Sequence, residues 1–71
     1  MIRDEEMLRD KLEYYFNNSI PIHIVLKNAR FYNGSVVTIE ETSIVFNDDF
    51  LQKMIIFLDE IKDIERQRPR L

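Results

Sequence analysis

The chain has 71 residues, which is enough for one domain but too few for a large hydrophobic core. It has no cysteine to form disulfides, and its single histidine, His23, has no partner at metal-ligand spacing, so association with other copies is the expected reinforcement. The formal net charge of −3 at pH 7 excludes a broadly basic nucleic-acid-binding surface, whereas 32% charged residues is typical of a globular chain.

One amphipathic helix is predicted from Arg3 to about Phe16, in an N-terminal segment of residues 1–18. Acidic residues in the first turn favour the positive end of the helix dipole, and Asn17-Asn18-Ser19 followed by Pro21 ends the helix. We expect the apolar stripe to seal the end of a barrel rather than to dock a partner protein. The stripe recurs at three- and four-residue spacing and consists of Met7, Leu8, Leu12, Tyr15 and Phe16.

Alternating residues after Pro21 predict a first strand, with Ile22, Ile24 and Leu26 on one face. Lys27-Asn28-Ala29 is a polar turn, and a long second strand follows over residues 30–39. Asn33-Gly34 could itself be a hairpin turn, but a split there would leave a very short strand before it. We therefore interpret Gly34 as a bulge or sharp bend within the second strand.

The remaining sequence predicts three more short strands. The third covers Ser43 to Phe46 and ends at the polar turn Asn47-Asp48-Asp49. The fourth covers residues 51–58 and is apolar at every position from 54 to 58, so we expect both of its faces to be covered. The last covers residues 61–66, with Ile61 and Ile64 as buried candidates, and residues 67–71 form a basic tail.

A helix followed by five antiparallel strands over residues 20–66 predicts a mostly β domain. The expected architecture is a strongly bent, OB-like or Sm-like partial barrel with the helix on its open end, and SH3-like barrels are the near alternative. No internal repeat or linker divides the sequence, so residues 1–71 form a single domain.

The segment from Ser19 to Asn28, followed by residues 29–34, resembles the opening of the Hfq family of Sm-like proteins. In that family a Val-Pro-Val pair of anchors leads into the first strand, a Val-Asn-Gly turn follows, and a glycine sits in the second strand. Residues 35–40, 44–47 and 54–61 are similar to the later strands in the same order. The resemblance covers roughly the whole chain, including the N-terminal helix, and implies an Sm-like fold.

The same resemblance implies a homo-oligomeric ring of six or seven copies, in which the fourth strand of one copy pairs with the fifth strand of its neighbour. The sequence gives an independent reason, because an all-apolar strand beside a short edge strand would aggregate unless another chain covered it. The residues expected at this subunit interface are Met54, Ile55, Ile56, Phe57, Leu58, Ile61 and Ile64.

Single-stranded RNA is the ligand that the resemblance implies. The family's uridine-holding positions correspond here to Leu58, Asp59 and Thr42, which supply neither a cation nor an aromatic ring. Arg30 and Tyr32 alternate onto one face of the second strand, where His23 or Lys27 could join them in stacking bases and contacting phosphate. The candidate nucleic-acid-binding residues are His23, Lys27, Asn28, Arg30, Tyr32, Thr42, Arg66, Arg68 and Arg70.

Two other classes of function compete with RNA binding. A structural or protein-binding ring that has lost the uridine site is favoured by Asp59, Thr42 and the acidic balance. An enzyme would need His23 together with loop carboxylates, but no catalytic spacing joins them, so we expect no catalytic residues, no metal and no cofactor. No apolar run is long enough to cross a bilayer, and the acidic N-terminus is unlike a signal peptide, which predicts a cytoplasmic protein without membrane insertion.

Overall fold

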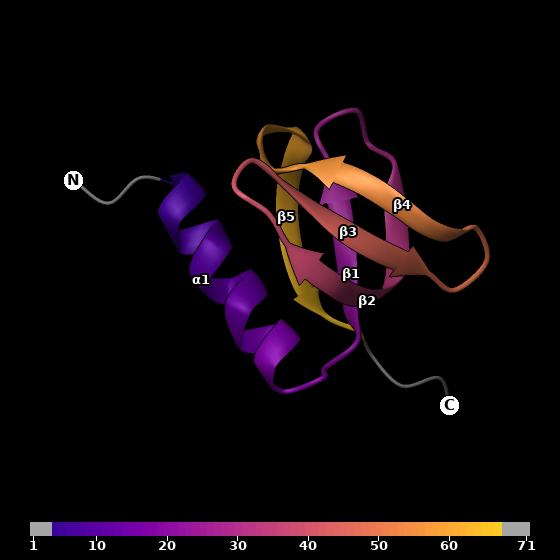
Figure 1. Ribbon diagram of the computed structural model, residues 1–71. Helices are drawn as coiled ribbons and strands as arrows, with labels where there is room; N and C mark the ends of the chain where they lie inside the picture. The colour runs from indigo at the N-terminus through magenta and orange to yellow at the C-terminus, as the bar shows by residue number, and fades with distance from the viewer. Residues whose placement is uncertain (1–3, 68–71) are drawn as a thin grey trace.

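A computed structural model describes residues 4–67 and shows an N-terminal helix beside a bent five-stranded antiparallel sheet (Figure 1). The strands follow the order β4-β3-β2-β1-β5, so β4 and β5 are the two edges of the sheet. The predicted fold class is confirmed. The elements are α1 (Asp4–Asn17), β1 (Ile22–Leu26), β2 (Phe31–Ile39), β3 (Ser43–Asp48), β4 (Gln52–Phe57), the 3-10 turn η1 (Leu58–Glu60) and β5 (Ile61–Arg66).

Helix α1 packs against β2, β5 and η1 through a narrower stripe than the sequence predicts. Leu12 is fully buried and Leu8 and Tyr15 are partly buried against the core, whereas Met7 and Phe16 are 53% and 40% exposed. Helices end readily at a residue with positive φ because the last carbonyls can then be satisfied. Here Ser19 has a φ of 52°, and the Ile20 N–H donates to the Tyr15 carbonyl at 2.9 Å.

Strand β1 alternates as predicted, with Ile22, Ile24 and Leu26 buried. Strand β2 pairs with β1 from Phe31 to Gly34 and with β3 from Gly34 onward, so it changes partner at its glycine. The bulge expected at Gly34 lies farther along, where the register shifts between residues 36 and 38. Gly34 instead permits a close approach of two backbones, because a Cβ there would lie 2.0 Å from the Asn47 carbonyl oxygen.

The turn between β3 and β4 starts later than predicted, because β3 continues through Asp48. The Asp48 side chain is buried, with 6% of the residue exposed, and its Oδ2 accepts N–H bonds from Phe50 and Leu51, each at 2.8 Å. An aspartate that accepts from the next residues stabilises a tight turn. The turn therefore covers residues 49–51, and Gln52 follows it with a φ of 68°.

The two edge strands differ in what they expose. In β4, Ile56 is buried and Met54 is partly buried, but Ile55 and Phe57 are 65% and 51% exposed. The expectation that both faces of this strand are covered is therefore not met within one copy. In β5, Ile61 and Ile64 are buried as predicted, although a regular strand would place positions three apart on opposite faces. A register shift against β1 corrects this spacing by leaving residue 62 without a partner.

One hydrophobic core joins the inner face of the sheet to α1 and η1. It contains Leu12, Ile22, Ile24, Leu26, Ile44, Phe46, Ile56, Leu58, Ile61 and Ile64. Between residues 4 and 67, no helix has the length and apolar character needed to span a bilayer.

Candidate nucleic-acid interface

The outer face of β1 and β2 carries three side chains that meet, His23, Phe31 and Asn33, which we call the outer-face cluster. His23 pairs with Asn33 across the two strands, and His23 Nδ1 lies 2.7 Å from Asn33 Oδ1. An amide oxygen only accepts hydrogen bonds, so His23 Nδ1 is the donor in this contact. The pair therefore combines an imidazole ring that a hydrogen bond holds in place with an amide NH2 group that can donate hydrogen bonds.

Phe31 supplies the apolar part of the cluster. Its ring centroid lies 5.4 Å from that of His23 at an interplanar angle of 41°, and the residue is 61% exposed. An aromatic side chain so exposed on a sheet is a platform on which a nucleobase can stack. The other two members of the cluster, His23 and Asn33, are half-buried, so the Phe31 ring lies beside side chains that are packed into the fold.

Tyr32 does not share a face with His23, so the predicted combination of these two residues is wrong. Tyr32 pairs with Ile24, whose side chain is buried, and it packs partly buried against the core. Phe31 and Asn33, its neighbours in sequence, face outward instead because side chains alternate along a strand. The signal that could have found them is the register, since an antiparallel hairpin closed by residues 27–30 places residue 33 opposite residue 23.

The turn between β1 and β2 places two cations at the end of this face. The Leu26 N–H donates to the Arg30 carbonyl at 2.7 Å, and Asn28 Oδ1 accepts the Arg30 N–H at 3.0 Å, with Ala29 at a φ of 74°. Lys27, Asn28 and Arg30 are all exposed. Arg30 immediately precedes Phe31, so these predicted residues lie in the turn that joins the two strands of the outer-face cluster.

At the other end of the cluster lies the turn between β3 and β4. The Asp49 N–H donates to the Asn33 carbonyl at 2.9 Å, and the next residue, Phe50, is 80% exposed. Asp49 Oδ2 also accepts a bond from Gln67 Nε2 at 3.4 Å. Gln67 follows Arg66, which is exposed at the end of β5, so Arg66 ends its strand near this turn. Arg68 and Arg70 lie outside the described residues.

Carboxylates on β5 limit the positive charge of the face. Glu65 pairs with His23 and Asp63 pairs with Val25, so an acidic strand borders the cluster. Thr42 is exposed in a different place, the turn between β2 and β3, where its carbonyl accepts the Leu58 N–H at 2.9 Å. The structure thus brings Thr42 to the start of η1 and not to the cluster.

The residues predicted at the subunit interface divide into two sets. Ile55 and Phe57 are exposed on edge strand β4 and are available to another copy. The others fill or line the core of the same chain, so an interface at these positions would use the backbone of the strand edges. This second set is Met54, Ile56, Leu58, Ile61 and Ile64.

No group of three or more histidine, aspartate or glutamate side chains in the described part of the chain could hold a metal ion. Comparison with models of known protein families gives no match for this sequence, and none of the curated proteins matches it.

Proposed function

We propose that the chain is a self-assembling Sm-like module that binds single-stranded RNA on the outer face of β1 and β2. The observation that carries this proposal is the 61% exposed Phe31 ring beside the hydrogen-bonded His23 and Asn33 side chains. Lys27 and Arg30 are exposed in the turn at the end of the same strands, and in this proposal they contact phosphates. Such RNA is present in the cytoplasm, where we propose that the module acts.

The chemistry of the cluster favours single strands over duplexes. An unpaired base can stack on an aromatic ring and present its edges to amide and imidazole groups, whereas the base edges of an RNA duplex are hard to reach. Stacking on one aromatic side chain contributes about 1–3 kcal/mol per base. One copy offers few such contacts, so useful affinity requires several copies that engage one strand together.

Self-assembly is supported by the two open edges of the sheet. Among the described strands, β4 and β5 each have only one neighbour. Edge strand β4 also exposes Ile55 and Phe57, by 65% and 51%. An unpaired edge with exposed apolar side chains readily pairs with another chain. Joining β4 of one copy to β5 of the next would satisfy both edges in every copy of a closed ring.

Fluorescence anisotropy with labelled U-rich, A-rich and mixed oligonucleotides at low salt tests the RNA proposal. We expect saturable binding of at least one oligonucleotide, and a weaker response from a Phe31→Ala variant. A Tyr14→Ala variant is a matched control, because Tyr14 is 56% exposed on α1, outside the cluster. Absence of binding at tens of micromolar protein would reject the proposal.

A second candidate, a protein-binding ring, is favoured by one specific observation. Glu65 and Asp63 lie beside the outer-face cluster on β5, and carboxylates repel phosphate groups. If this second function holds, a pull-down from nuclease-treated lysate retains specific proteins. Recovery of nucleic acid alone from untreated lysate rejects it.

A further inference from the structure

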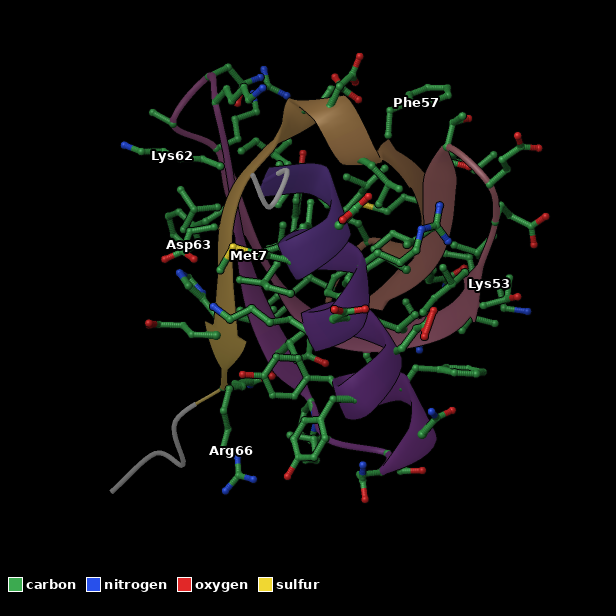
Figure 2. The ribbon with its side chains drawn as sticks, turned by 90° about the vertical axis from the view of Figure 1, so that its left-hand side faces the viewer. Met7, Lys53, Phe57, Lys62, Asp63 and Arg66 are labelled. Atoms are coloured by element: carbon green, nitrogen blue, oxygen red, sulfur yellow. The ribbon has the colours of Figure 1, made fainter. Side chains whose placement is uncertain are left out.

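A groove of about 560 Å³ lies between α1, η1 and β5. Its apolar lining includes Met7 and Ile64, and Figure 2 shows Met7 reaching from α1 to β5 beside Asp63. Three lysines also line it, Lys11, Lys27 and Lys62, of which Lys11 lies 4.0 Å from Asp63. Two aspartates, Asp59 and Asp63, share the rim with these three lysines, and we call this apolar site the α1–β5 groove.

At the end of β4, exposed Phe57 has acidic surroundings. Its N–H donates to Glu60 Oε1 at 3.4 Å, and it pairs with Ser43 at the start of β3. Glu40 and Glu41 are exposed in the turn that leads into β3. We call Glu40, Glu41 and Glu60 the acidic collar of Phe57, and Arg9 is the cation beside it, because its guanidinium donates to the Glu40 and Glu41 carbonyls.

We propose that the α1–β5 groove of one copy receives Phe57 of a second copy. This inference rests on the proposed self-association and names the side-chain contact within it. Its basis is complementarity, because an apolar ring with an acidic collar matches an apolar groove on whose rim lysines outnumber aspartates. Two further features, the exposed Phe57 side chain and the uncovered groove, are both explained by this single contact.

The geometry allows this contact only between copies. Phe57 ends β4 just before η1, and it does not line the groove that η1, α1 and β5 form in its own copy. A contact between two different surfaces is head-to-tail, and it closes into a ring when the rotation between copies permits. The groove volume falls within the roughly 300–1,000 Å³ of sites that enclose small ligands, so a phenyl ring fits.

Disulfide trapping tests the contact directly, because the natural chain contains no cysteine. A Glu60→Cys variant places a thiol beside Phe57, and a Lys62→Cys variant places one on the groove rim, while both keep Phe57 and the apolar lining of the groove. After mild oxidation of an equimolar mixture, we expect the mixed dimer to exceed both symmetric dimers. A Leu51→Cys variant, at a 63% exposed position in the turn between β3 and β4, is the control partner for Lys62→Cys.

A second change identifies the ring that occupies the groove. Adding Phe57→Ala to the Glu60→Cys variant should lower the trapped fraction roughly tenfold or more, as truncation of a buried aromatic anchor does. Adding Phe50→Ala, which removes an 80% exposed ring elsewhere, should leave it unchanged. Both sites are exposed, so circular dichroism should show intact folds.

The outcomes separate this inference from the proposed function. If light scattering shows a monomeric natural chain and no disulfide forms, the proposed self-association fails together with the contact. If the chain assembles but the mixed dimer forms no faster than with Leu51→Cys, or is insensitive to Phe57→Ala, only the groove contact is overturned.

Discussion

Gly34 of β2 lies against the backbone carbonyl of Asn47 in β3 with no room for a side chain between them. A Cβ on Gly34 would lie 2.0 Å from the Asn47 carbonyl oxygen and 3.0 Å from the Asp48 Cα. Both neighbours are backbone atoms of β3, which is also held by pairing to β4. The chain's only glycine is therefore required at the position where β2 exchanges β1 for β3.

A Gly34→Ala substitution should destabilise the fold by about 1–3 kcal/mol or more, because β3 must move to admit the methyl group. Urea unfolding at one fixed protein concentration measures the change, since self-association makes stability depend on concentration. Ser35→Ala is the control, an exposed neighbour on the same strand, with an expected change within about 0.5 kcal/mol. An unfolding midpoint equal to that of the natural chain would show that the two strands are farther apart.

Replacing Asp48 by Ala should cost about 1–3 kcal/mol, because the Phe50 and Leu51 N–H groups lose their shared acceptor. Asp48→Asn keeps one oxygen and should lose less. Asp49→Ala is the control, since Asp49 is exposed and its side chain makes only a long bond to Gln67. Thermal unfolding of the three variants ranks them, and equal losses for Asp48→Ala and Asp49→Ala would contradict this account of the turn.

Phe31→Ala should weaken RNA binding by about 1–3 kcal/mol, the contribution of stacking one base on an aromatic ring. Stability should change little, because Phe31 is 61% exposed. Anisotropy titration measures the affinity, with Tyr14→Ala as the matched loss of an exposed ring. Equal affinity of the Phe31→Ala variant and the natural chain would remove the outer-face cluster from the binding site.

Arg30→Ala should reduce the salt dependence of RNA binding as well as its strength. Each phosphate contact to a single strand contributes about 0.7 to the slope of log K against log salt. Titrations at several salt concentrations should therefore give a shallower slope for Arg30→Ala, and likewise for Lys27→Ala. Lys53→Ala removes an exposed cation from β4 and should leave the slope unchanged. A slope that falls equally in all three variants would indicate diffuse charge attraction rather than contacts at the β1–β2 turn.

Ile55→Lys should prevent assembly without unfolding the chain. Ile55 is 65% exposed on edge strand β4, and a lysine on a strand edge opposes pairing with another chain. Leu51→Lys is the control, because Leu51 is similarly exposed but lies in the turn before β4. Analytical ultracentrifugation should show a smaller species for Ile55→Lys alone.

The periodicity of apolar residues alone predicts the elements that bury one face in a single core. The burial of Ile22, Ile24 and Leu26 follows from period two, and the packing of Leu12 follows from the helical stripe. The position of the β3–β4 turn does not follow, because Asp48 looks like a turn residue in sequence but ends a strand in the structure. Its buried carboxylate organises the turn from the strand end, which local residue preferences do not reveal.

The candidate site was only partly predictable for a related reason. The turn residues Lys27, Asn28 and Arg30 could be identified by their polarity, but the face of β2 depends on its register with β1. An error of one residue in this register puts Tyr32 on the outer face in place of its two neighbours, because adjacent side chains in a strand point to opposite faces. The register is set by the turn that closes the hairpin and by burial of the opposite face. Both are known only from the three-dimensional structure.

Self-association is the premise shared by the proposed pairing of the edge strands, the proposed Phe57 contact and the proposed multivalent binding of RNA. Size-exclusion chromatography with multi-angle light scattering on the purified natural chain tests it most directly. The account predicts a discrete species whose mass is a multiple of 8.6 kDa and which persists on moderate dilution. A well-folded particle of 8.6 kDa at high protein concentration would contradict it.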